Sequence, residues 1–305
     1  MNVTLREPKI GALQIKQMIV AVDLSPNSEK TAAYASSIAK SFGATVTLVH
    51  VYPPDPIMEM NMEQIDDRFS KERTEMRQKL ENLSAKIRET YPKCRAEFCT
   101  GKPAKDVTLV AERLNADLIV TASHNHTFLG QLFNMEQAPK MVHRAPCPVL
   151  VYQHAPEKPA FGIRQIVAPT DLSAESLQAL NYALEMAEHF KSKLTVLRVY
   201  EETASATGET ARTGTPTLDR KYVDKALLDL WENARARQIV CETIFEWGRP
   251  NELITATADK FEADLLIIST HDFHWLHHLF FRSDAENILR HAPCPVLIFR
   301  EKGTR

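Results

Sequence analysis

Short runs of consecutive apolar residues alternate along the chain with longer stretches in which apolar residues recur at a helical period. Runs at 17–22, 46–51 and 118–120 have the length and continuity of strands that are buried on both faces. Residues 31–42 carry one apolar face, and residues 62–91 form a long, highly charged helical pattern. Strands that alternate with crossover helices predict an α/β fold with a doubly wound parallel sheet.

The whole pattern occurs twice. Residues 116–152 and 263–299 align at a constant offset of 147 (263 minus 116), and each segment contains Pro-Cys-Pro ahead of an apolar run. Proline cannot continue a helix, so the chain must restart there as a strand. We therefore predict two domains of the same fold, residues 13–153 and 163–300, joined by a proline-containing linker.

Two polar stretches between the predicted elements carry further expectations. Ser25 and Ser28 precede the first predicted helix, and we expect them to cap it through their side-chain oxygens. Residues 201–216, EETASATGETARTGTP, are too polar and too rich in Thr, Gly and Ser to pack. They predict a mobile loop.

The composition is that of an ordinary globular protein, with 44% hydrophobic and 25% charged residues. A net charge of −2 gives no electrostatic reason to expect nucleic acid or an anionic membrane as a partner. No apolar run approaches the roughly 18 to 20 residues that span a bilayer. We therefore expect a cytoplasmic protein with neither nucleic-acid nor membrane partners.

The five cysteines are an odd number without the spacing of a disulfide scaffold, which favours thiols. Cys147 and Cys294 lie between prolines ahead of buried strands, and we interpret them as small buried hydrophobic residues rather than redox groups.

Histidines gather in two equivalent loops, where imidazoles three and four residues apart on a helix could hold zinc. No cysteine or carboxylate completes a recognised metal spacing, and loop histidines are more often plain polar side chains, so we predict no metal site. These residues are His124 and His126 in the first half, and His271, His274, His277 and His278 in the second.

Three motifs make the chain recognisable. Asp23 and Asp171 each end a strand ahead of a helix, Gly101 and Gly248 each begin a Gly-x-Pro turn, and the halves close with HRAPCPVLVY and RHAPCPVLIF. In these motifs, and over almost its whole length, the chain resembles a tandem universal stress protein. The alternative for the two aspartates is that each merely caps the following helix.

The resemblance implies the fold and a ligand. Each half would be a five-stranded parallel sheet of order 3-2-1-4-5, similar to the adenine nucleotide alpha hydrolases, and many family members bind ATP. Asp23 and Asp171 would then lie near the base and ribose, and the strand ends at Val51 and Val199 would contact adenine.

The family's phosphate loop has the form Gly, two residues, Gly, nine residues, Gly, then Ser or Thr, and this chain has lost all six glycines. That favours weak or absent triphosphate binding, with no certain cofactor and an adenine nucleotide as the candidate ligand. The four places are held by Ala122, Asn125, Met135 and Glu136 in the first half, and by Ser269, Asp272, Arg282 and Ser283 in the second.

Two functions follow as alternatives. The first is a non-catalytic stress-response protein with degenerate nucleotide-binding crevices, which acts by binding a small ligand or a protein partner. The second is an ATP-binding member that hydrolyses ATP slowly. No nucleophile with a base stands at a recognised motif spacing, which favours the first.

We expect association both between the two halves of one chain and between two chains. The last strands, 149–152 and 296–299, would be edge strands, and pairing one with the other would cover both. Met58, Met60 and Met62 precede the long helix as an adaptable surface, and we expect a homodimer.

Overall fold

A computed structural model of the 305-residue chain describes residues 13–53, 62–122, 141–142, 144–153, 162–200, 203–204, 210–211, 220–269 and 283–301. Contacts divide the chain into two compact units. The first half is the unit built mainly from residues 14–156, and the second half is the unit built mainly from residues 157–299.

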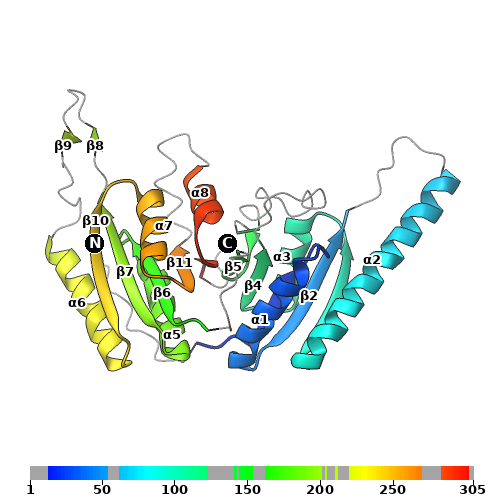
Figure 1. The fold of residues 1–305 in the computed structure, drawn as a ribbon, viewed down its shortest axis with the longest axis horizontal. Coiled ribbons are helices and arrows are strands. Elements are labelled where there is room, and N and C mark those ends of the chain that lie inside the picture. Colours follow the sequence, from blue (N-terminus) through cyan, green and yellow to red (C-terminus); the bar gives the residue numbers. More distant parts are fainter. Residues whose placement is uncertain are drawn as a thin grey trace. The chain divides into compact units, whose positions relative to one another are not determined.

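The first half is a parallel five-stranded sheet of order β3-β2-β1-β4-β5, with α1 and α3 on opposite faces (Figure 1). This order confirms the expected 3-2-1-4-5 fold. Its elements are β1 (Gln17–Ala21), α1 (Ser28–Phe42), β2 (Thr45–Tyr52), α2 (Met62–Thr90), β3 (Cys94–Thr100), α3 (Pro103–Arg113), β4 (Leu118–Ala122) and β5 (Val149–Tyr152).

The second half repeats the arrangement, with the parallel order β10-β7-β6-β11-β12. Its elements are β6 (Gln165–Thr170), α5 (Ala174–Phe190), β7 (Lys193–Tyr200), β8 (Thr203–Ala204), β9 (Thr210–Ala211), α6 (Arg220–Ala236), β10 (Cys241–Trp247), α7 (Pro250–Lys260), β11 (Leu265–Ser269), α8 (Ser283–His291) and β12 (Val296–Phe299).

The central strands are buried on both faces, as the continuous apolar runs predicted. Successive side chains of a strand point to opposite faces, and Met18, Ile19 and Val20 of β1 are all 0% exposed. After each Pro-Cys-Pro the chain restarts as a strand, and the carbonyls of Pro148 and Pro295 accept bonds of 3.0 Å from β4 and β11. The prolines lack N–H donors but still join the sheet through their carbonyls.

Helix α2 packs through a stripe at helical spacing. Leu80, Ser84 and Ile87 are 1%, 0% and 4% exposed, whereas Met76 and Leu83 are partly exposed. The stripe therefore includes a serine that the apolar pattern could not select.

One sequence expectation was wrong in detail, and another was incomplete. The N-cap of α1 is Asn27, and Ser28 lies inside the helix, where its hydroxyl donates to Asp23 instead of capping. Residues 203–204 and 210–211, within the expected mobile loop, form the short antiparallel pair β8 and β9. Threonine and alanine at these places can supply a two-residue backbone ladder without a buried face, which an argument from packing does not detect.

Candidate functional site

The candidate site lies at the carboxyl ends of the strands, where the sheet order reverses. In the first half β1 lies between β2 and β4, so the strand order reverses at β1. In parallel α/β sheets, ligands bind in the crevice beyond the strand ends at such a reversal. Asp23 follows β1 directly, Val51 lies near the end of β2, and Ala122 ends β4. The structure thus brings these three predicted residues to one edge of the sheet.

The end of β2 runs past its pairing with β1. Pairing of β2 with β1 extends to Val49, whereas pairing with β3 continues to Tyr52. Val51 as a whole residue, backbone included, is 0% exposed. In the second half the β6–β7 ladder ends at Arg198, and Val199 beyond it is partly exposed.

Asp23 organises the turn into α1. One carboxylate oxygen, Oδ1, accepts bonds from the Ser25 backbone N–H at 3.0 Å and from the Ser28 hydroxyl at 2.8 Å. Asp23 is 8% exposed, and Ser25 and Ser28 are 8% and 3% exposed. Oδ1 of Asp23 therefore holds the turn of its own loop.

Asp171 occupies the equivalent turn but is partly exposed. Its Oδ1 accepts a bond of 2.8 Å from the Ser173 backbone N–H. Burial alone would raise the pKa of Asp171, but bonds from Ser173 and Ser176 and the charge of Arg198 outweigh it and lower the pKa below its ordinary value. Asp171 is therefore an anion at neutral pH with one side towards solvent.

Neither aspartate is the N-cap of its helix. The N-cap residues are Asn27 in the first half and Ser173 in the second, where the Ser173 hydroxyl accepts from the Ser176 N–H at 3.2 Å. Each aspartate instead closes the turn that leads into the helix.

A basic side chain on the second strand faces the same carbonyl in both halves, a feature that the motif analysis missed. His50 Nδ1 lies 2.8 Å from the carbonyl oxygen of Val22, so Nδ1 is the donor. Arg198 Nη1 donates to the carbonyl of Thr170 at 3.2 Å. The signal was present in the repeat, because His50 and Arg198 each directly precede the predicted Val51 and Val199.

The two basic side chains, His50 and Arg198, differ in charge. Burial lowers the pKa of His50, although the bond to Val22 and the charge of Asp23 act to raise it. His50 is 2% exposed and neutral near pH 7. The guanidinium of Arg198 lies 5.1 Å from the ring centre of Tyr200. Among the described residues, a guanidinium therefore acts on the crevice aspartate of the second half, whereas the equivalent strand position of the first half holds a neutral imidazole.

The Gly-x-Pro turns fix the neighbouring strand ends. The Gly101 N–H donates to the Tyr52 carbonyl at 2.8 Å, and the Gly248 N–H donates to that of Tyr200 at 2.9 Å. Both glycines have positive φ, 152° and 147°. A Cβ on Gly101 would lie 2.4 Å from Asp106 Oδ2, so this turn requires glycine.

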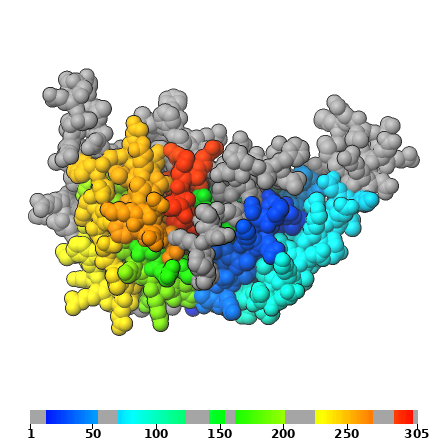
Figure 2. Space-filling model, viewed as in Figure 1, coloured from blue at the N-terminus to red at the C-terminus, as the bar shows by residue number. Residues whose placement is uncertain are grey.

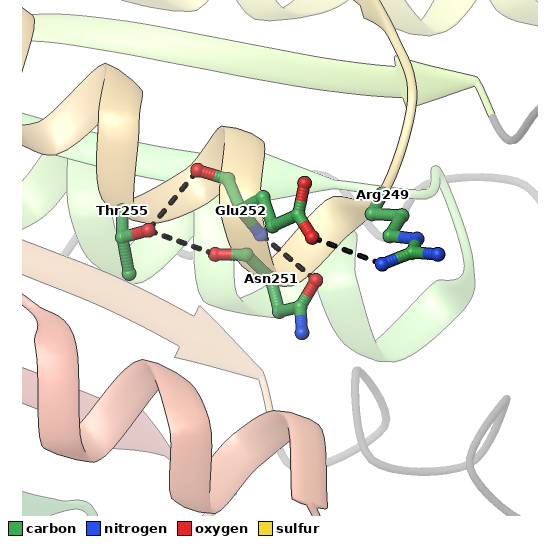
Figure 3. Close-up of polar contacts among 4 residues, drawn as sticks. All are labelled: Arg249, Asn251, Glu252 and Thr255. Carbon is green, nitrogen blue, oxygen red and sulfur yellow. Dashed lines mark hydrogen bonds and ion pairs between the residues drawn. The ribbon is translucent and has the colours of Figure 1, made fainter.

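Hydrogen bonds and one ion pair order the start of α7, which follows the turn at Gly248 (Figure 3). The side-chain oxygen of Asn251 accepts from the Glu252 N–H at 2.8 Å, and Arg249 Nη1 lies 3.2 Å from Glu252 Oε1. The Thr255 hydroxyl donates to the carbonyls of Asn251 and Glu252, each at 3.0 Å. These groups are engaged with one another and order the helix start.

The phosphate-loop positions are only partly described. Ala122 and Ser269 are 8% and 1% exposed at the ends of β4 and β11, and Ser283 begins α8. The other predicted loop residues, the clustered histidines and the methionines before α2 lie outside the described residues: Asn125, Met135, Glu136, Asp272, Arg282, His124, His126, His271, His274, His277, His278, Met58 and Met60.

The residues that the structure describes give little support for a metal site, a membrane span or reactive thiols. Among them, no group of three His, Cys, Asp or Glu side chains is placed to hold a metal ion, and no helix has the length and apolar character to cross a bilayer. None of the five cysteines forms a disulfide, as predicted, and Cys147 and Cys294 are 0% and 1% exposed. Burial raises the pKa of Cys99, with help from Glu97, and that of Cys241, with help from Glu242, each to about 11.

Comparison with known proteins finds a family whose model matches both halves of the chain. The model of the Universal stress protein family matches residues 14–153 and 162–300. A universal stress protein of Thermus aquaticus is 32% identical over 136 residues, which is 45% of this chain and 97% of that protein. Universal stress protein A homolog 1 of Coxiella burnetii is 32% identical over 141 residues, or 45% and 96%.

Solved structures share the fold across both halves. The crystal structure of a universal stress protein from Archaeoglobus fulgidus matches with a TM-score of 0.70 at 20% identity, covering 95% of this chain and 98% of that one. A functionally unknown protein from Pseudomonas aeruginosa matches with a TM-score of 0.60 at 17% identity, covering 94% and 93%.

Proposed function

The chain belongs to the universal stress protein family, with two such domains in tandem, and from this membership we propose that it is a non-catalytic stress-response protein. Its second-half crevice binds the adenosine part of a nucleotide, as AMP or adenosine, without gripping a triphosphate. The protein then acts through this small ligand or through a protein partner that senses the ligand.

The difference between the two aspartates carries the proposal. Asp171 is partly exposed and anionic, and it can accept a hydrogen bond from a ribose hydroxyl. Asp23 is 8% exposed and already accepts two bonds from its own turn. Arg198 adds a cation beside Asp171, whereas the equivalent His50 is buried and neutral. The second crevice is thus better suited than the first to a ligand with an anionic group.

The residues at the phosphate-loop positions argue against tight binding of ATP. Glycines in such a loop let backbone N–H groups approach phosphate oxygens, and the sequence has Asn125, Met135 and Arg282 at places where the family's loop has glycine. Glu136 and Asp272 bring carboxylates to the same loop. At about 4 Å and an effective dielectric near 20, a like-charge contact costs on the order of 4 kcal/mol before screening, and even half of that lowers affinity more than tenfold.

Three described side chains that could serve as nucleophile or base, Cys99, Cys241 and His50, are poorly suited to catalysis. The thiols of Cys99 and Cys241 stay protonated at neutral pH because their pKa values are raised to about 11. His50 is buried and its Nδ1 proton is held by the Val22 carbonyl. These features favour ligand binding over turnover.

Nucleotide extraction distinguishes the proposed function from the alternative, an ATP-binding protein that hydrolyses ATP slowly. The full chain is purified without a histidine tag, dialysed and denatured, and the released nucleotide is identified by chromatography. We expect AMP or adenosine, or none, and no phosphate release from added ATP above the rate in buffer. Stoichiometric ATP, or phosphate release that is lost in Asp171→Ala, would overturn the proposal.

A further inference from the structure

Large apolar side chains are exposed on the surface of the second half around its edge strand. They come from α6, from β10 and from the turn between them, and the surface of α6 appears in yellow in Figure 2. We call this set the β10 surface. Its members and exposed fractions are Leu228 (53%), Trp231 (44%), Val240 (66%), Phe245 (46%) and Trp247 (38%).

The duplication supplies an internal comparison for this surface. At the offset of 147 that aligns Gly101 with Gly248, four of the five positions are polar in the first half and the fifth is a phenylalanine. Phe98 is covered by the guanidinium of Arg77, 4.9 Å from its ring centre. The apolar surface is therefore a property of the second half alone. The equivalent residues are Glu81, Ser84, Lys93, Phe98 and Thr100.

The exposed rings are held in place. Trp247 stacks on Tyr200 with ring centres 4.8 Å apart, and Phe245 lies 6.3 Å from the same ring. Trp231 Nε1 donates to the Thr243 hydroxyl on β10 at 3.2 Å. Rings that are already fixed lose little conformational freedom when they are covered, which makes them effective contacts.

The backbone of β10 offers a second kind of contact. Strand β10 pairs along residues 241–247 with β7 and, within the described part of the chain, with no other strand. The outer edge of such a strand presents N–H and C=O groups that can pair with an added strand. Phe245 and Trp247 lie on one face of β10, and Glu242 and Glu246 lie on the other.

The negative charge on β10 indicates which kind of strand could pair with its outer edge. Glu242 is exposed, and the first-half equivalents of Glu242 and Glu246 are Arg95 and Cys99. A second copy paired through β10 would bring these glutamates against their own counterparts, and like charges on facing strands are destabilising. A strand with basic residues at alternate positions would instead complement them.

We propose that the β10 surface binds an extended basic peptide of a partner protein by strand addition. Large apolar residues of the peptide cover Trp231, Phe245 and Trp247, and alternating lysine or arginine residues meet Glu242 and Glu246. This binding is independent of any nucleotide in the crevices.

Synthetic peptides test the inference on the full chain. The probe is a nine-residue peptide in which lysine alternates with valine, titrated while tryptophan fluorescence is recorded. Its controls are the same peptide with glutamate for lysine, and the lysine peptide methylated on alternate backbone nitrogens. We expect the lysine peptide to bind at least tenfold more tightly than either control, because only it can both pair with the edge and complement the glutamates.

Variants place the site on β10. The double variant Glu242→Lys and Glu246→Lys should lose at least tenfold in affinity for the lysine peptide and gain affinity for the glutamate peptide. Trp247→Thr, which installs the residue of the first half, should lose about tenfold. The matched control Arg95→Ala, on the edge strand of the first half, should leave the affinity unchanged.

Four results would overturn the inference. They are equal binding of the lysine and glutamate peptides, equal binding of the methylated peptide, no binding at millimolar peptide, and binding that appears only after residues 1–12 are deleted. The last result would make the chain's own amino end the occupant. A fifth result, light scattering in which the Glu242→Lys and Glu246→Lys variant dissociates a dimer, would assign the surface to a second copy.

Discussion

Replacing the two crevice aspartates should separate their roles, because the same residue type is buried in one half and partly exposed in the other. Asp23→Ala should cost more stability than Asp171→Ala. Asp171→Ala should instead lower the affinity of the second half for its ligand. The internal repeat makes each variant the matched control of the other.

The magnitude follows from what each variant leaves behind. Without Asp23, the Ser25 N–H and the Ser28 hydroxyl, in residues 8% and 3% exposed, lose the carboxylate oxygen that accepts from them. Each buried donor left unsatisfied costs about 1–3 kcal/mol, so we expect a loss of about 3 kcal/mol in the free energy of unfolding of the first half.

The second half should lose about 1 kcal/mol, since its donors have other partners. The Ser173 N–H is in a partly exposed residue, and the Ser176 hydroxyl keeps contacts of 3.0 Å with Thr170 Oγ1 and 3.2 Å with the Ser173 carbonyl. The folded-state pKa of Asp171 is lowered, so its stabilisation is present above about pH 4, its ordinary range, and is lost as the pH falls through the folded value.

Urea unfolding can follow the halves separately. All three tryptophans, Trp231, Trp247 and Trp275, lie in the second half, so their fluorescence reports that half while circular dichroism reports both. With an m-value of about 2 kcal/mol per M, Asp23→Ala should lower the first-half midpoint by about 1.5 M, and Asp171→Ala the second-half midpoint by about 0.5 M. Equal losses, or a larger loss for Asp171→Ala, would refute the reasoning.

Three further predictions concern the strand ends. His50→Gln should flatten the fall in stability between pH 6.5 and 5: the folded-state pKa of His50 is lowered, so the wild-type stabilisation is present above about pH 6.5 and is lost as the pH falls, and urea midpoints across this range check it. Gly101→Ala should destabilise by roughly 2 kcal/mol and Gly248→Ala by about half as much, since the new Cβ would lie 2.4 Å from Asp106 Oδ2 in one case and 3.2 Å from Leu253 Cδ1 in the other; thermal unfolding compares them. Cys99 and Cys241 should react slowly with a thiol reagent at pH 8, because each pKa is raised to about 11, and rapid modification of the folded chain would contradict this.

The elements of the fold could be predicted because they follow from local pattern. Continuous apolar runs gave β1 and β4, and the loss of donors at Pro-Cys-Pro gave the restart at β5 and β12. The turn at Asp23 could not be resolved in this way, since Asn27 is as good a capping residue as the neighbouring serines. Which oxygen accepts from Ser28 depends on how β1 meets α1 in space.

The sequence predicted which residues follow the strand ends, but not how those residues are packed. Motif position located Asp23 and Asp171 correctly at the strand ends, yet their different burial depends on packing around each turn. The contacts of His50 and Arg198 with the opposite carbonyl depend on the register between the first and second strands, which no local pattern specifies. Likewise, the exposure of Trp231 could not be read from an apolar face that predicts burial.

Calorimetric titration of the full chain with AMP and with ATP plus magnesium tests the central claim most directly. We predict that AMP binds at one site per chain, that Asp171→Ala abolishes the signal while Asp23→Ala retains it, and that ATP binds at least tenfold more weakly than AMP. A dissociation constant for ATP in the low micromolar range or tighter would contradict the account, because it would mean that the substituted loops still hold a triphosphate.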